Sequence, residues 1–396
     1  MEFTFYNPVR IVFGAGKLAQ AGELAAAWGK RPLVVTHPDV MARAGHLERL
    51  VGFLGRSGLQ AEVFDAGKPN PLSSMVDHGV EAARRSARDV VIGLGGGSAI
   101  DAAKAIAVAV VHEEPAWRLV CSGDADHVDP SGGLPIIAIP TTAGTGSEVT
   151  DGAVLTNPVT REKAGIMCPY GFPKTSIIDP ELMKTAPPEV TAATGLDVLF
   201  HALEAYVSKN ANPVSDGYAE QALTIVGTSL RTAYRDGSNL EARTRMAWAS
   251  TAGGLAICGA GVTMLHAMGH PVSGHFDATH GIAMAALFPS FFDYIWESAA
   301  EKLSRIAPLL GEQVAGLSTQ DAARACRAIV LRLMSDVGVT QSLRDLGARE
   351  KDIPSLAADA MKNMGLFVEL SPRSADENQL AAVFRYAMSA AGSPVG

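Results

Sequence analysis

Runs of β-branched residues alternate with alanine-rich helical stretches between about residue 10 and residue 180. The strand-like runs cover residues 32–36, 90–94, 134–139 and 175–178. A regular alternation of strand and helix predicts a parallel sheet with helices packed on its faces, which is an α/β fold.

The strand signal fades after residue 180, and long amphipathic stretches dominate the rest of the chain. They cover residues 213–234, 318–337 and 376–391, and their periodicity predicts helices. A chain of 396 residues is also too long for one ordinary core. We therefore predict two domains, an α/β domain over 1–182 and an all-helical domain over 183–396. The last residues, 392–396, are expected to form a frayed tail.

One stretch, 246–265, resembles a membrane span because it carries no charge over 20 residues. Its four glycines and its serine and threonine residues keep its hydrophobicity weak, so we expect a buried helix rather than a span. That helix is expected to lead into His266, and Pro271 is expected to limit how far a helix continues beyond it.

Two loops rich in small residues each follow a strand-like run. In the segment 90–104, the three glycines at 95–97 let the backbone approach a ligand closely, and Ser98 is placed to cap the following helix. A helix start of this kind offers unpaired N–H groups and a positive dipole end to phosphate. The segment 139–150 is similar. Neither a G-x-G-x-x-G fingerprint nor a P-loop is present, but two such loops predict the walls of one nucleotide cleft.

Possible metal ligands recur at helical spacing in the second half of the chain. Asp197 and His201 lie four residues apart, as do His266 and His270, which places each pair on one helix face. His280 follows in a glycine-flanked stretch, so four of the ten histidines fall between 266 and 280. A single pair is often coincidental, but this clustering favours a site. Imidazole nitrogens with one carboxylate suit a borderline divalent metal such as Fe²⁺ or Zn²⁺.

Taken in order, these motifs resemble the iron-containing (group III) alcohol dehydrogenases, which share a fold with glycerol dehydrogenase and dehydroquinate synthase. The resemblance covers nearly the whole chain. The matching segments are the opening Phe13–Gly16, Pro69–Pro71, the G-G-G-S-x-x-D-x-x-K segment at 95–104, the P-T-T-x-G-T-G-S-E segment at 140–148, the Gly195–Asp197 helix and the histidine block at 266–280.

The resemblance implies a four-ligand metal site made of Asp197, His201, His266 and His280. His270 matches a family histidine near substrate and cofactor, and it is the candidate for proton transfer because an unperturbed imidazole has a pKa near ~6.5. The alternative is that His270 only orients other residues. Glu204 shares a helix face with Asp197, but helix charge pairing explains its presence equally well.

The resemblance also implies a nicotinamide cofactor held by the first domain. Many NAD-preferring relatives have an aspartate at the position of His37. An aspartate there would repel the 2′-phosphate of NADP. His37 lacks this negative charge, whereas Asp39, two residues later, restores it. NAD is therefore the expected cofactor and NADP the alternative. The positions that match or adjoin cofactor contacts are His37, Asn70, Gly96, Gly97, Ser98, Asp101, Thr141, Thr142, Thr145 and Lys163.

The implied activity is that of a metal-dependent, NAD(P)-linked alcohol dehydrogenase or aldehyde reductase, with its active site expected in the interdomain cleft. Relatives often read Ala-Phe-Ser-Asn-Ala-Gly where residues 256–261 read Ala-Ile-Cys-Gly-Ala-Gly, which implies a differently shaped substrate pocket. A zinc-dependent polyol dehydrogenase is one alternative. A synthase or lyase of the dehydroquinate synthase type is another, although it needs basic residues for an acidic substrate and 259–281 contains no Lys or Arg. A non-catalytic scaffold is the third.

Charge and cysteine content limit the partners and the compartment. The net charge of −8 disfavours a nucleic-acid or anionic-membrane surface. Four scattered cysteines without a C-x-x-C pair suit a reducing cytosol, and residues 1–12 lack the pattern of a signal peptide. We therefore expect a cytoplasmic enzyme with a small-molecule substrate. The resemblance implies a homodimer or larger homo-oligomer.

Overall fold

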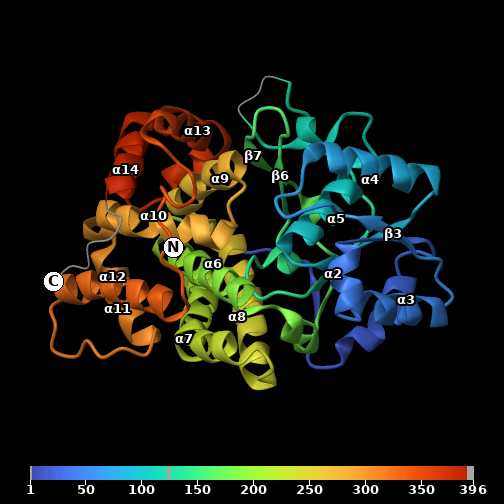
Figure 1. The fold of residues 1–396 in the computed structure, drawn as a ribbon, viewed down its shortest axis with the longest axis horizontal. Coiled ribbons are helices and arrows are strands. Elements are labelled where there is room, and N and C mark those ends of the chain that lie inside the picture. Colours follow the sequence, from blue (N-terminus) through green and yellow to red (C-terminus); the bar gives the residue numbers. More distant parts are fainter. Residues whose placement is uncertain (1, 123–125, 390–396) are drawn as a thin grey trace. The chain divides into compact units, whose positions relative to one another are not determined.

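The computed structural model describes residues 2–122 and 126–389, and it contains two compact units (Figure 1). One unit comprises residues 7–186 together with 237–247. The other comprises the N-terminal residues up to Tyr6, residues 187–236 and the chain from Trp248 onward.

The first unit is built on a six-stranded parallel sheet in the order β1-β8-β5-β4-β2-β3. The four strands predicted from sequence are the four inner strands, so the α/β prediction is confirmed. The direction of chain progression across the sheet reverses between β2 and β4. The strands are β1 (Arg10–Phe13), β2 (Pro32–Thr36), β3 (Glu62–Asp65), β4 (Val90–Gly95), β5 (Ile136–Pro140) and β8 (Thr175–Ile178).

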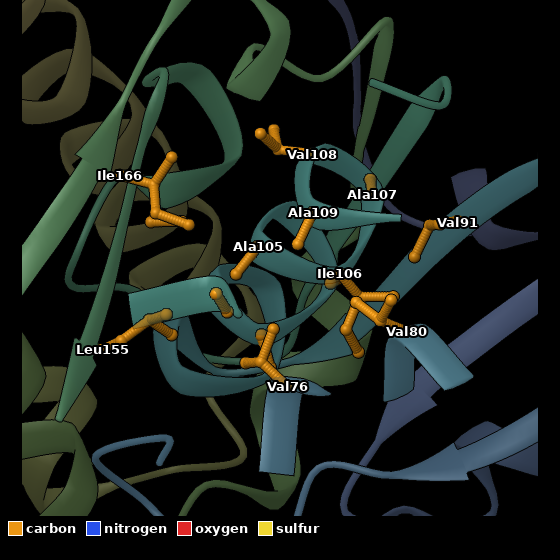
Figure 2. Packing of buried hydrophobic residues seen from close by; sticks show 14 of the residues in the cluster. Val76, Val80, Val91, Ala105, Ile106, Ala107, Val108, Ala109, Leu155 and Ile166 are labelled. Carbon is orange, nitrogen blue, oxygen red and sulfur yellow. The ribbon is translucent and has the colours of Figure 1, made fainter. Parts of the chain in front are cut away.

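Helices cover both faces of this sheet because successive side chains of each strand point to opposite sides. On β2, Leu33 and Val35 pack in the cluster that contains helices α4 and α5, whereas Val34 packs in the cluster that contains α1 to α3. Figure 2 shows the first cluster, where Val80 of α4 lies against Ile106 of α5. The helices are α1 (Ala21–Ala26), α2 (Pro38–Arg43), α3 (His46–Arg56), α4 (Ser73–Arg85) and α5 (Gly97–Ala109).

An antiparallel hairpin of β6 (Gly152–Thr156) and β7 (Lys163–Met167) lies outside the parallel sheet. The sequence analysis did not predict it. Its buried side chains Leu155 and Ile166 belong to the cluster that contains α4 and α5, so the hairpin packs against α5 (Figure 2). Short 3₁₀ helices in the chain are η1 (Lys17–Gln20), η2 (Ala116–Leu119), η3 (Ser147–Val149), η4 (Pro169–Gly171), η5 (Pro180–Thr185), η6 (Trp296–Ala299) and η7 (Glu350–Asp352).

Among its described residues, the second unit is helical, as predicted. The predicted helices at 213–234, 318–337 and 376–391 correspond to α7, α12 and α14, and the expected tail at 392–396 lies outside the described residues. The helices are α6 (Pro188–Val207), α7 (Pro213–Arg235), α8 (Leu240–Ala260), α9 (Met264–Phe276), α10 (His280–Ile295), α11 (Ala300–Leu309), α12 (Thr319–Asp336), α13 (Ile353–Glu369) and α14 (Glu377–Ser389).

Two expectations about the approach to His266 were wrong. The uncharged stretch 246–265 is not one helix, because Gly261 adopts a left-handed φ of 71° and the chain turns by 113° between α8 and α9. Helix α9 also continues past Pro271 to Phe276. Proline removes one backbone donor, but the end of α9 is held to α13 by a hydrogen bond between His275 and Asp359 at 2.6 Å.

Across the described residues, no single helix is long and apolar enough to cross a membrane. The bent pair of α8 and α9 meets the length and composition criteria only when the two helices are taken together.

Candidate metal and cofactor sites

Asp197 and His201 lie one turn apart on α6, as their spacing predicts, and both are buried. Nδ1 of His201 is 4.0 Å from Oδ1 of Asp197. The helix begins at Pro188, which is preorganised for a first helical turn and leaves the polar pair well inside the helix. Helix α6 therefore supplies a carboxylate and an imidazole on one face.

His266 and His280 bring two more imidazoles to the same carboxylate. Nε2 of His266, on α9, and Nε2 of His280, the first residue of α10, each lie 3.8 Å from Oδ1 of Asp197. The rings of His201 and His266 stack with centroids 4.4 Å apart. Three separate helices thus place one carboxylate and three imidazoles together (α6, α9 and α10 in Figure 1).

Gly281 explains how His280 comes so close to α6. A Cβ atom at residue 281 would lie 2.0 Å from the backbone oxygen of Ala193, which is one turn before Asp197. Only glycine permits this approach of the start of α10 to the backbone of α6. Gly281 therefore sets the position of His280.

The electrostatics of this cluster favour an ionised carboxylate. Burial by itself raises the pKa of Asp197, but the imidazoles of His201, His280 and His266 outweigh burial and hold the pKa well below its usual range. Burial lowers the pKa of His266, yet the Glu204 carboxylate and Asp197 raise it to about 9.

The donor set fits a divalent cation. Oδ1 of Asp197 and Nε2 of His266 are buried and have no hydrogen-bond partner among the described residues. Ligand atoms of Asp197, His201 and His266 all lie within 4.8 Å of one another. Atoms bound at about 2.0–2.2 Å to one tetrahedral metal are about 3.3–3.6 Å apart, so the observed 3.8–4.0 Å requires only a small contraction.

Glu204 reaches the same cluster from α6, and the sequence analysis gave it no function. Its carboxylate is fully buried and forms an ion pair with Nδ1 of His266. Burial raises the pKa of Glu204, but the contacts with His266 and Thr263 reverse the shift, so the group favours its ionised form. The only sequence signal was its position seven residues after Asp197, on the same helix face.

His270 lies beside the cluster. It is one turn past His266 on α9, is buried, and its ring centroid is 5.4 Å from that of His280 at a steep interplanar angle of 68°. His275, near the end of α9, forms a hydrogen bond with Asp359 of α13.

The predicted cofactor positions gather at one edge of the parallel sheet. Strands β2, β4 and β5 are adjacent and parallel, so their carboxyl ends lie together, followed by His37, Gly96 and Thr141 respectively. The two small-residue loops touch each other, since a Cβ atom at Gly97 would lie 2.5 Å from Cγ2 of Thr145. In open α/β sheets, ligands bind at this edge, where the strand order reverses.

Ser98 does not cap α5, which corrects one sequence expectation. The N-cap is Gly96 in an extended conformation, Ser98 lies inside the first turn, and no side chain of the described residues caps the helix. The helix start therefore keeps the N–H groups that suit a phosphate.

Three polar positions assigned to the cofactor show different environments. Asp101 accepts hydrogen bonds from Oγ of Ser147 at 2.5 Å and from the backbone N–H of Val154 at 3.1 Å, which ties α5 to the second loop and to β6. Nζ of Lys163 donates to Oδ1 of Asn70 at 2.9 Å, and both side chains are buried. Asn70 has a left-handed φ of 56°.

His37 follows β2 as the N-cap residue of α2, and its Nδ1 donates to the carbonyl of Gly67 at 3.0 Å. Because a carbonyl can only accept, the proton resides on Nδ1. Asp39 lies in the first turn of α2 and is exposed.

The chain belongs to the iron-containing alcohol dehydrogenase family. The family model described as iron-containing alcohol dehydrogenase matches residues 8–180, and the model for the C-terminal part of the same family matches residues 191–388. The protein is therefore an oxidoreductase of the alcohol dehydrogenase class, as the motifs implied, and the synthase alternative is not favoured.

Individual relatives agree over almost the full length. The chain is 40% identical to a 1,3-propanediol dehydrogenase of Klebsiella pneumoniae over 97% of this chain and 98% of the relative. It superimposes with a TM-score of 0.94 on an archaeal alcohol dehydrogenase from a Red Sea brine pool, at 34% identity over 98% and 99% of the two chains. A sulfoacetaldehyde reductase of Bifidobacterium kashiwanohense, solved with NAD⁺, gives a TM-score of 0.84 at 31% identity over 98% and 100%.

Proposed function

We propose that this chain interconverts a small alcohol and its aldehyde with NAD(H), using a divalent metal bound by Asp197, His201, His266 and His280. The observation that carries the proposal is the convergence of three imidazoles, those of His201 and His266 buried and that of His280 half-buried, on Oδ1 of Asp197 at 3.8–4.0 Å. A buried carboxylate oxygen without a hydrogen-bond donor is costly unless a cation completes it.

The chemistry divides between two sets of residues. A divalent cation in the histidine cluster supplies Lewis acidity toward the oxygen of the alcohol or aldehyde. The nicotinamide supplies or accepts the hydride. The first unit would contribute binding: the N–H groups at the start of α5 would hold the cofactor phosphates, and Lys163, which donates to Asn70, would bind a polar part of the same cofactor.

We assign proton transfer to His270. It lies on α9, one turn past His266, and its ring centroid is 5.4 Å from that of His280 on α10. A buried imidazole beside the cluster can accept the hydroxyl proton during oxidation and return it during reduction.

Iron(II) is our first choice of metal and zinc the alternative, because the same donor set suits both. NAD is our first choice of cofactor, supported by the relative solved with NAD⁺, although the absence of an acidic residue at His37 leaves NADP as the alternative. Small alcohols, diols and aldehydes are the substrate class, supported by the named relatives.

We further propose a homo-oligomer, at least a dimer, that works in the reducing cytosol. The compartment is supported by the cysteines, since Cys121, Cys168, Cys258 and Cys326 are all free thiols in the structure.

The test is oxidation of NADH and of NADPH by metal-stripped protein reloaded with Fe²⁺ or Zn²⁺, over a panel of small aldehydes and hydroxyaldehydes. We expect turnover that depends on one metal, is abolished in His266→Ala and persists in the matched control His78→Ala, an exposed histidine on α4. Tight binding of metal and nucleotide without turnover of any substrate in the panel would contradict the proposal.

A further inference from the structure

We infer that Glu204 is the positioning residue of the metal site. Its carboxylate orients the ring of His266 and also accepts hydrogen bonds from the N–H groups at the start of helix α9. This inference rests on the proposed function, since it assigns His266 to a cation. Glu204 lies three positions after His201 on α6. From the sequence, its charge was equally well explained by pairing within its own helix.

The contacts of Glu204 all reach across to another helix. Its Oε1 accepts from the backbone N–H of Thr263 at 2.9 Å, from Oγ1 of Thr263 at 2.6 Å and from the backbone N–H of His266 at 3.2 Å. Its Oε2 accepts from Nδ1 of His266. Charge pairing within α6 therefore does not explain this residue, because Glu204 pairs with His266, 62 positions away in sequence.

The start of helix α9 is held by this carboxylate together with Ser371, whose Oγ accepts from the N–H of Met264 at 2.9 Å. The N-cap residue Thr263 makes no side-chain cap of its own. Glu204 instead satisfies the N–H of the N-cap residue and the N–H of the third helical residue, which is His266 itself. These donors have no partner within their helix, and a buried helix start needs one from elsewhere. The backbone of the ligand is thus anchored by the group that holds its ring.

The same contact fixes which ring nitrogen is available to a cation. A carboxylate only accepts hydrogen bonds, so the proton of the neutral imidazole resides on Nδ1, and Nε2 presents its lone pair. Nε2 is the atom that faces Oδ1 of Asp197 at 3.8 Å and has no hydrogen-bond partner among the described residues. A carboxylate that holds the second nitrogen of a ligand histidine in this way fixes the tautomer and the orientation of the ring.

The discriminating variant is Glu204→Gln. Glutamine retains one oxygen for the N–H groups that start α9, but its NH₂ group then faces Nδ1 of His266. Nδ1 must accept, so the ring proton moves to Nε2 and blocks the lone pair. We expect an about 10- to 100-fold loss of Zn²⁺ affinity, measured by chelator competition on the zinc-loaded protein. Glu220→Gln is the matched control, because Glu220 accepts a hydrogen bond from the hydroxyl of Tyr206 at 3.0 Å and lies on α7. The Zn²⁺ affinity of this variant should equal that of the wild type.

Equal Zn²⁺ affinity in Glu204→Gln and wild type would overturn the inference while leaving the proposed function intact. Failure of the wild type itself to bind either Zn²⁺ or Fe²⁺ would overturn the proposed function. If Glu204→Gln does not fold, the zinc-loaded wild type labelled with ¹⁵N-histidine decides. The ring signal of His266 is assigned as the one that the His266→Gln variant lacks. We expect this ring to carry its proton on Nδ1, and a proton on Nε2 would contradict the inference.

Discussion

The Nε2 atom of His266 lies 3.8 Å from the Oδ1 atom of Asp197, and neither atom has a hydrogen-bond partner among the described residues. At this distance the two groups do not hydrogen-bond to each other. A buried imidazole nitrogen and a buried carboxylate oxygen that face one another without hydrogen-bond partners are an arrangement that a shared cation stabilises when it displaces the proton on Nε2. The proposed metal site rests on this relationship and on the two further imidazoles near the same oxygen.

Replacing Gly281 by alanine should weaken metal binding. The added Cβ would meet the backbone oxygen of Ala193 at 2.0 Å, so α10 must move away from α6 and carry His280 with it. We expect at least an about 10-fold loss of Zn²⁺ affinity, measured by chelator competition. The control is Gly217→Ala on α7, where a Cβ meets nothing within 4 Å. There the substitution should leave affinity unchanged and stabilise the helix by up to about 1 kcal/mol. Unaltered affinity in Gly281→Ala would show that His280 is not a ligand.

Replacing Lys163 by methionine should weaken NAD(H) binding and leave metal content unchanged. The variant removes a buried ammonium that donates to Asn70 at the predicted cofactor site. Loss of one charge-assisted hydrogen bond corresponds to about 1.5–3 kcal/mol, so the Kd for NADH should rise about 10- to 100-fold. Fluorescence titration of NADH measures this, with the exposed Lys174→Met as control. A Kd equal to that of the wild type would remove Lys163 from the cofactor site.

His46 should make the free energy of unfolding depend on pH. Burial lowers the pKa of His46, and the hydrogen bond of Nε2 to the carbonyl of Leu182 at 3.0 Å only partly offsets this. A base with a lowered pKa in the folded state binds fewer protons there than in the unfolded chain. The contribution of His46 to the free energy of unfolding is therefore fully present above the unfolded-state pKa of about 6.5, and it is lost as the pH falls below that pKa.

The variant His46→Gln keeps a donor for Leu182 but does not titrate. Denaturant unfolding at pH 7.5 and at pH 5.5 should show a smaller loss of stability for the variant than for the wild type. An equal loss in the two proteins would contradict the assignment of this pH dependence to His46.

The sequence predicted most of the fold because its signals are local. The four inner strands are apolar runs with clear ends, and the helices have regular periodicity. The hairpin β6–β7 was missed because Gly152–Thr156 and Lys163–Met167 are short, contain glycine and show little alternation. The break at Gly261 was missed because an uncharged stretch does not reveal where a glycine takes a left-handed conformation.

The candidate site was predictable to the extent that spacing and family motifs describe it. The four-residue spacing placed Asp197 and His201 on one face of α6, and the structure places His266 and His280 on the same carboxylate. The role of Glu204 was not predictable, because its contacts with Thr263 and His266 join residues about 60 positions apart. Only the packed structure shows that Glu204 contacts His266 rather than forming a charge pair within α6.

The most direct test of the metal site is a crystal structure of the zinc- or iron-loaded protein with anomalous diffraction collected at the absorption edge of the metal. The account predicts one strong anomalous peak per chain, at about 2.0–2.2 Å from Asp197 and from the ring nitrogens of His201, His266 and His280. A loaded protein with no peak among these four residues, or with its peak elsewhere, would contradict it.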